Sequence, residues 1–300
     1  MTNLSLAIAS QYLRHSPFET AKWRIADFLR KKLAANPVHS IIKVAGGTLM
    51  ELDTSDFLQR ELYVFRDFEP AISREIKKRL KAGDTFLDIG ANVGFYSLIA
   101  ARAVGAGGNV YAFEPAPKTR AVLENNRRLN GAKNVTAVSV GLSDAAGEGE
   151  LFLDAKNNSG ASSLRRTPNS GDSVCVMLDT YDHFAAVNAL PNPALIKIDV
   201  EGAELKVLKG MAKLLSQPSR RPPVILEVSE WSLEEMGSSK DELFKLMSSY
   251  GYKPKLLSRP RVSIFSGRNI YFQYDVLFEP AAASVPLRCN RELPVEVVRN

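Results

Sequence analysis

The chain has 300 residues, of which 45% are hydrophobic, and it carries a formal net charge of +6 at pH 7. This length and composition fit one large α/β domain that buries roughly three quarters of its unfolded surface. No stretch is apolar for long enough to span a bilayer, the first ten residues lack the features of a signal peptide, and two cysteines suit a reducing compartment, so we expect a cytoplasmic protein.

The first 68 residues are predicted to form a cap on the main domain. Residues 4–33 carry apolar side chains at helical spacing with a break at Pro17, and Pro37 ends this helical part. Residues 41–68 contain IIKV, LMELD and ELYVFRDF, whose alternation and aromatic content predict an extended segment or a small hairpin. We place the main domain at 69–280 and a tail at 281–300.

Positive charge is concentrated before residue 84, where 14 Lys and Arg residues stand against 9 Asp and Glu residues. Such a concentration can mark a face for nucleic acid or lipid. In residues 74–81, however, the basic residues alternate with Ile76 and Leu80, as on the solvated side of an amphipathic helix. No aromatic residues are interleaved with them, so we expect no nucleic-acid partner.

Strands and helices alternate after the cap, which predicts a doubly wound parallel sheet. The predicted elements up to residue 140 are a helix at 71–81, a strand at 85–89, a helix at 93–103, a strand at 109–113, a helix at 117–129 and a strand at 135–140.

After Gly141 the pattern changes to two short alternating strands, GEGELFLD and SVCVMLDTY, separated by the polar loop KNNSGASSLRRTPNSG. We predict an inserted β-hairpin whose long mobile loop is either a lid over the substrate or a plain hairpin tip. We expect this loop and the cap to line the acceptor side of any pocket.

The alternation then resumes and completes a sheet of about seven strands. The predicted elements are the strand ALIKIDV, a helix at 202–216, the strand PVILEV, a helix at 240–250 that opens with a capping box of Ser239 and Glu242, and closing strands near 254–258 and 271–278.

Residues 86–97 read FLDIGANVGFYS, an apolar strand followed by a turn and an apolar helix. The turn is built on Gly90, Asn92 and Gly94, and such a turn brings bare backbone against a ligand. Twenty residues after Gly94, the strand NVYAF runs into Glu114, a carboxylate at the place where a ribose offers its paired hydroxyls. These features predict a nucleoside-binding α/β half.

The nucleoside is indicated by the residues between the glycines. NAD needs glycine where this chain has Asn92, because its pyrophosphate touches the backbone there in the G-x-G-x-x-G fingerprint. Asp88, at the end of the strand, would repel a pyrophosphate but can hold an ammonium group or a water. S-adenosylmethionine carries an amino acid head and no phosphate, so the D-x-G-x-N-x-G form favours it over NAD.

Five segments occur in order: DIGANVGFYS, YAFEP, GLSD at 141–144, NSGASSL at 158–164 and KIDVEGAELKVLKG at 197–210. Together they resemble the FkbM family of S-adenosylmethionine-dependent methyltransferases over about residues 69–252. The resemblance implies a class I methyltransferase fold with a Rossmann-like sheet. It also implies methyl transfer, usually to a hydroxyl of a sugar, a glycan or another small natural product.

The glycine turn and the next strand end supply the cofactor assignments. Four residues are assigned to the methionine part of S-adenosylmethionine: Asp88, Gly90, Asn92 and Gly94. Glu114 is assigned to the ribose hydroxyls through two charge-assisted hydrogen bonds. Asp144 matches the family position expected near adenine, with a plain turn acid as the alternative.

Acidic residues at later strand ends are the catalytic candidates. A hydroxyl acceptor must lose its proton during methyl transfer, so the site needs a base or a metal. Ligands of open α/β sheets bind beyond the carboxyl ends of the strands, where Asp199, Glu201 and Glu227 are predicted to lie. Asp199 is the first choice for contact with cofactor or acceptor, whereas Glu204 is interpreted as an acid that caps a helix N-terminus.

Asp199 and Glu227 are also candidates for a Mg²⁺ site across adjacent strand ends. Alternatively, one of them is the general base, or Glu227 is a structural acid paired with an Arg or Lys. His183 is interpreted as a helix-surface residue. Cys175 and Cys289 are too far apart in sequence for a metal knuckle, and a disulfide between them stays open.

Two other protein classes stay open beside the methyltransferase. An NAD(P)-dependent Rossmann oxidoreductase would share the pattern of strand, turn and acid but would need the glycine that Asn92 replaces. A non-catalytic methyltransferase-like scaffold would keep the fold and lose cofactor contacts. Binding of S-adenosylmethionine separates an enzyme from a scaffold.

Overall fold

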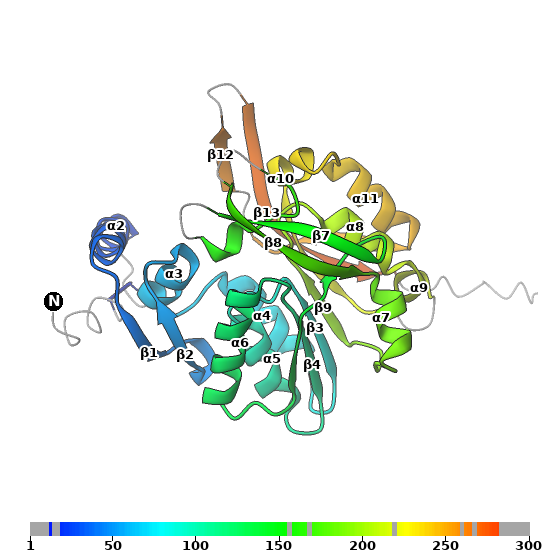
Figure 1. Ribbon diagram of the computed structural model, residues 1–300, viewed down its shortest axis with the longest axis horizontal. Helices are drawn as coiled ribbons and strands as arrows, with labels where there is room; N and C mark the ends of the chain where they lie inside the picture. Colours follow the sequence, from blue (N-terminus) through cyan, green and yellow to red (C-terminus); the bar gives the residue numbers. More distant parts are fainter. Residues whose placement is uncertain are drawn as a thin grey trace, which may run out of the picture.

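Within the described residues, a mixed sheet of eight strands forms the centre of the molecule: seven lie in one continuous order, and the eighth, β12 (Arg261–Phe265), pairs with one of them (Figure 1). The computed structural model describes residues 12–13, 19–154, 158–166, 170–217, 221–258, 261–265 and 269–281. The strands follow one another across the sheet in the order β11 (Tyr252–Leu256), β13 (Asn269–Pro280), β10 (Val224–Ser229), β9 (Leu195–Ile198), β3 (Thr85–Ile89), β4 (Asn109–Phe113) and β5 (Val135–Val138).

The chain winds outward from β3 in both directions. It first adds β4 and β5 on one side and later adds β9 and β10 on the other, and these five strands are parallel. The long strand β13 enters antiparallel to both β10 and β11. This order confirms the predicted class I methyltransferase sheet, and it puts the point where the winding reverses between β3 and β9.

Helices cover both faces of the sheet because successive strand residues point to opposite sides. Phe86 packs into one hydrophobic cluster and Leu87 into the other. The first face is covered by α4 (Pro70–Arg79), α5 (Phe95–Val104) and α6 (Pro117–Leu129). The second face is covered by α7 (Tyr181–Val187), α8 (Glu204–Gly210), α9 (Ala212–Ser216), α10 (Glu230–Glu235) and α11 (Lys240–Ser249).

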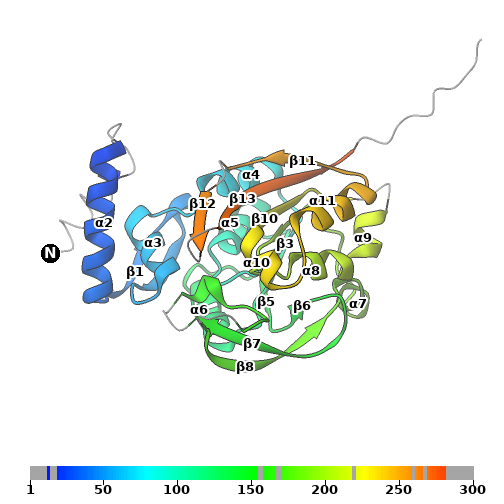
Figure 2. The ribbon, with the colours of Figure 1, turned by 90° about the horizontal axis from the view of Figure 1, so that it is seen from above.

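The N-terminal region places a helix and a hairpin beside this sheet. Figure 2 shows α2 (Glu19–Ala35) at the edge of the molecule, with the hairpin of β1 (His39–Lys43) and β2 (Leu49–Asp53) and the helix α3 (Phe57–Phe65) between it and the sheet. The predicted helix over 4–33 is confirmed from Glu19 onward, and its break at Pro17 lies outside the described residues. None of the described helices combines the length and the apolarity needed to cross a membrane.

The segment ELYVFRDF was predicted to be extended, and this is wrong, because most of it belongs to α3. The helix begins with a cap that the alternation analysis missed: the Asp56 carboxyl accepts a hydrogen bond from the backbone N–H of Gln59. Leu62, Tyr63 and Val64 are all buried, so the short helix is enclosed on several sides and lacks the one-sided period of a surface helix.

Asn126 of α6 and Asn130, the residue that follows the helix, hold the N-terminal hairpin in place. The Asn126 side chain accepts the N–H of Glu51, and the Asn130 side chain accepts the N–H of Leu49 at 2.9 Å and donates to its carbonyl oxygen. The Asn126 amide also donates to the backbone carbonyl of Val93, in the turn that precedes α5. The N-terminal region is therefore tied to the element that carries the glycine turn.

The predicted insertion is confirmed as a hairpin of β7 (Gly147–Asp154) and β8 (Ser170–Asp179), which joins β6 (Gly141–Leu142) in a separate three-stranded sheet. Within the insertion, Tyr181 begins α7 instead of ending the strand, and a 3₁₀ turn, η2 (Ser159–Ala161), lies in the loop.

Two features after the insertion also differ from the prediction. The helix predicted at 202–216 is split at Met211 into α8 and α9. The helix α10 and the strand β12 (Arg261–Phe265) were not predicted.

Candidate active site

A cavity of about 530 Å³ opens at the carboxyl ends of β3, β4, β9 and β10. Its position is the reversal point of the sheet, where open α/β proteins bind their ligands, and its volume lies in the usual range for small-molecule sites, about 300–1,000 Å³. Residues of α3, of η2 and of the hairpin β12–β13 complete the wall. The cap and the inserted loop thus both line the pocket, as expected from the sequence.

The glycine turn forms one wall of this cavity. Gly90 and Asn92 line it, and both have positive φ, at +78° and +48°. The N–H groups of Gly90 and Ala91 donate to the backbone carbonyl of Phe113, which fixes the turn against the end of β4. Gly94 also has a positive φ, +87°, but it precedes α5 and packs against Leu123 and does not line the cavity.

Glu114 lies at the end of β4 with its carboxylate at the cavity wall. One oxygen accepts the N–H of Asn92 and the other accepts the N–H of Ala116, each at 2.9 Å. Burial raises the pKa of Glu114 to about 7, against the opposing effect of these two hydrogen bonds. Each oxygen keeps a lone pair for a second donor, as a diol with two hydroxyl groups would require.

Asp88 lies inside the protein and does not line the cavity. Its side chain is 0% exposed, and one carboxyl oxygen accepts a hydrogen bond of 2.5 Å from the Ser97 hydroxyl. Burial raises the pKa of Asp88, while the ammonium group of Lys197, 4.0 Å away, opposes the rise. Contact between Asp88 and a ligand would therefore be indirect, through Lys197 or the turn.

Lys197 was missed in the sequence analysis, although it stands two residues before Asp199. Its Nζ lies 2.9 Å from the Asp199 carboxylate and 3.4 Å from the Gly90 carbonyl oxygen, and 5.1 Å from the centre of the Tyr96 ring. The attraction of Asp199 and Asp88 raises the pKa of Lys197 even though burial opposes it. A lysine inside a predicted apolar strand could have indicated a buried ion pair.

Three acids predicted at the strand ends come together in the cavity. Carboxyl oxygens of Asp199, Glu201 and Glu227 lie within 4.8 Å of one another, and all three residues line the pocket. Burial and the nearby charge of Asp199 raise the pKa values of Glu201 and Glu227. The Mg²⁺ assignment to Asp199 and Glu227 and the catalytic assignments stay predictions.

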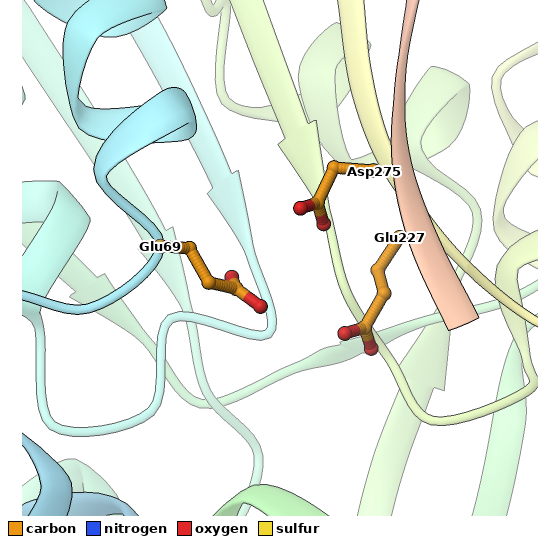
Figure 3. Close-up of side chains that lie close together, drawn as sticks. All are labelled: Glu69, Glu227 and Asp275. Carbon is orange, nitrogen blue, oxygen red and sulfur yellow. The ribbon is translucent and has the colours of Figure 1, made fainter. Parts of the chain in front are cut away.

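A second acid group shares Glu227. Figure 3 shows Glu69, Glu227 and Asp275 pointing toward one another, and one oxygen of each lies within 4.8 Å of the others. The guanidinium of Arg261 lies 2.6 Å from Glu69 and 3.6 Å from Glu227. Glu227 thus has an arginine partner, as in the alternative that it is a structural acid. Glu69, Asp275 and Arg261 were not predicted; the charged residue within the otherwise apolar YDVLF run was the signal for Asp275.

The remaining candidates lie away from the cavity. Asp144 is exposed and outside the wall, although Gly141 and Leu142 just before it line the pocket, so its place near adenine stays a prediction. The exposed ring of His183 contacts Asp179 on the surface of α7, as interpreted from the sequence. Glu204 is the first residue of α8, and its carboxyl group accepts the N–H groups of Val200 and Gly202 in the turn before the helix; these bonds hold the turn, and a cap of the helix amides stays a prediction.

Buried acids with raised pKa values make the stability of the protein pH-dependent. Glu114 and Glu204 both have a pKa of about 7 in the fold, against 4.5 ordinarily, mainly because they are buried. Between those values the folded chain keeps protons that the unfolded chain has released, so the free energy of unfolding falls as pH rises from 4.5 to 7. Each acid contributes up to about 1 kcal/mol per pH unit.

We therefore expect the melting temperature of the ligand-free protein to fall between pH 5 and pH 7, as measured by circular dichroism. Glu204→Gln should flatten the decline, whereas Glu234→Gln, at an exposed acid of α10, should leave it unchanged. A melting temperature that rises over this interval would contradict the assigned directions.

The strand order and the position of the cavity define a class I methyltransferase. Residues 88–254, more than half of the chain, match the family model described as the methyltransferase FkbM domain, and the chain belongs to this family. Because the chain belongs to this family, the oxidoreductase alternative is dropped. Methyl transfer is the activity of the class.

Two relatives of known role are similar in sequence. The hexuronic acid methyltransferase AglP of Haloferax volcanii is 29% identical over 158 residues, which cover 52% of this chain and 62% of that protein. The 31-O-demethyl-FK506 methyltransferase FkbM of Streptomyces tacrolimicus is 25% identical over 255 residues, which cover 75% of this chain and 92% of that protein. The chain thus spans less than two thirds of the length of AglP.

Among solved structures, methyltransferase FkbM from Methylobacillus flagellatus is similar, with a TM-score of 0.43 and 17% identity over 73% of this chain and 52% of that chain.

Proposed function

We propose that the protein transfers the methyl group of S-adenosylmethionine to a hydroxyl of a sugar, a glycan or another small hydroxylated molecule. One observation carries the proposal. The Glu114 carboxylate is hydrogen-bonded to the glycine turn in the wall of the cavity, and the acids Asp199, Glu201 and Glu227 line the same cavity. When bound, S-adenosylmethionine would supply an electrophilic methyl group and a positive charge.

The residues of the cavity fit this cofactor. Glu114 offers one free lone pair on each oxygen, which suits the two hydroxyls of a ribose. Gly90 and Asn92 line the cavity, and at Gly90 only backbone can meet a ligand. Asp199 and Lys197 form an ion pair at the neighbouring strand end, which suits the charged amino and carboxylate groups of a methionine part.

We assign proton removal to Glu201. Its carboxyl group lines the cavity, and among the described residues none donates a hydrogen bond to it. Burial and the charge of Asp199 raise its pKa, which makes its carboxylate a stronger base. Asp199 and Glu227 lie beside it and orient the acceptor.

The acceptor class is supported by the relatives and by the cavity. One relative is named as a methyltransferase of hexuronic acid and another of a demethylated FK506, both hydroxylated small molecules or sugars. Polar side chains of the inserted loop, Asn158, Ser159 and Ser162, line the cavity and offer hydrogen bonds to hydroxyl groups.

The test is a turnover assay with methyl-labelled S-adenosylmethionine and a panel of glycans and hydroxylated metabolites, read by mass spectrometry. We expect one product with a labelled O-methyl group and a kcat lowered by about 10²–10⁴ in Glu201→Gln, as for loss of a general base. Cofactor affinity should stay within a few-fold in that variant. Labelling of a nitrogen, or an unchanged kcat in Glu201→Gln, would overturn the respective part of the proposal.

A further inference from the structure

Asp275 lies beside the cavity as a buried acid without a hydrogen-bond partner for its side chain. It is 1% exposed, and neither carboxyl oxygen receives a hydrogen bond from the described residues. A buried, unpartnered carboxylate costs several kcal/mol unless a cation or a proton neutralises it. A bound cation would remove this cost.

Two further acids, Glu227 and Glu69, point toward Asp275 from other elements of the fold. Glu227 on β10 is its direct cross-strand partner on β13, and like charges placed opposite each other in a sheet repel. Glu69 reaches the same point from the residue before α4, and one oxygen of each acid lies within 4.8 Å of the others (Figure 3). Three acids from three separate elements thus converge on one point.

The charge of this trio is balanced only in part. Arg261 is the one cation that forms an ion pair with these acids within the described chain, and it contacts Glu69 and Glu227 but not Asp275. Its side chain is 47% exposed, so the guanidinium enters from the solvent side of the group. One positive charge faces three acids, which leaves room for a cation of higher charge.

We propose that Glu69, Glu227 and Asp275 form a binding site for a divalent cation that prefers oxygen ligands, with Arg261 holding two of the ligands until the ion enters. Carboxylates alone, with no histidine or cysteine among them, select Ca²⁺, Mn²⁺ or Mg²⁺ over Zn²⁺. This trio differs from the pair Asp199 and Glu227 predicted from the sequence and shares only Glu227 with it.

The separations fit ions of this kind. Two ligand atoms of one Ca²⁺ ion stand at most about 4.8 Å apart, since each bond is about 2.4 Å long, and the three acids satisfy this limit. Mg²⁺ has shorter bonds of about 2.1 Å, so its ligand atoms stand at most about 4.2 Å apart. Through Glu227 the ion would border the acids Asp199 and Glu201, where it could hold an acceptor oxygen.

The inference is tested with Mn²⁺ as the probe, by the loss of its free electron paramagnetic resonance signal on titration into the whole chain. We expect one ion per chain, with an affinity at least about tenfold lower in Asp275→Asn, which loses one ligand and one charge. Asp172→Asn, the same change at an exposed position of β8, should bind as the wild type does. Arg261→Gln should bind several-fold more tightly, because the competing cation is gone.

Two outcomes would overturn the site: no Mn²⁺ bound by folded wild type and Arg261→Gln at about 1 mM, well above the dissociation constants of sensor-type sites, or equal binding by wild type and Asp275→Asn. Mn²⁺ should also raise the melting temperature of the wild type but not of Asp275→Asn. If that variant fails to fold, Glu69→Gln takes its place with the same expected loss. The titration needs no cofactor, so its outcome is separate from that of the proposed methyl transfer.

Discussion

Replacing Glu114 by alanine is expected to weaken S-adenosylmethionine binding by about 100-fold or more. The variant loses two charge-assisted hydrogen bonds to the ribose hydroxyls, each of which contributes about 1.5–3 kcal/mol. The adenine and methionine parts keep their contacts, so binding falls without disappearing. Isothermal titration calorimetry with S-adenosylmethionine measures the change.

The controls separate a lost ligand contact from a damaged turn. Glu114 also accepts the N–H groups of Asn92 and Ala116, so the melting temperature of each variant must be measured beside its affinity. Glu124→Ala, at a surface acid of α6 paired with Arg127, is the matched control and should bind as the wild type does. An affinity within about threefold of wild type in folded Glu114→Ala would remove the ribose assignment, because that is far below the expected loss.

Gly90→Ala is expected to destabilise the fold by about 3 kcal/mol or more. A Cβ atom at Gly90 would lie 1.8 Å from the backbone carbonyl oxygen of Asp199, and the φ of +78° is unfavourable for any residue with a side chain. The end of β3 and the end of β9 would have to separate, which also opens the cavity between them. Urea unfolding followed by fluorescence gives the free energy.

Gly83→Ala is the matched control for backbone strain alone. Gly83 has a φ of +89°, yet a Cβ atom there would meet no other atom within 4 Å. Its expected cost is about 1–2 kcal/mol, the ordinary penalty for the left-handed region. If Gly90→Ala were no more destabilising than Gly83→Ala, the close approach of the two strand ends would not be what requires glycine.

The sheet and much of the site were predictable because both depend on local sequence signals. The buried strands, the glycine turn and the acids at strand ends were each visible within a few residues. In a parallel sheet the carboxyl ends of neighbouring strands meet at one edge, so the positions of Glu114, Asp199 and Glu227 at the ends of predicted strands were enough to expect them near one another.

What the sequence analysis missed depends on contacts between distant elements. Asp275 comes from β13, whose register on β10 sets it opposite Glu227, and Arg261 comes from β12, which pairs with β13; register cannot be deduced from one strand. Glu69 reaches the cavity from the start of α4, and the helical state of α3 depends on its burial between α2 and the rest of the fold. Lys197 was overlooked because a buried lysine is rare unless charges pair with it.

We propose that the cavity at the ends of β3, β4, β9 and β10 is a nucleoside site for a sulfonium cofactor. A crystal structure of the protein grown with S-adenosylhomocysteine tests it most directly. We predict the nucleoside in this cavity, with both ribose hydroxyls within hydrogen-bond distance of the Glu114 carboxylate and the amino acid part along the glycine turn. A ligand bound elsewhere, or a cavity that stays filled by side chains at saturating ligand, would contradict the account.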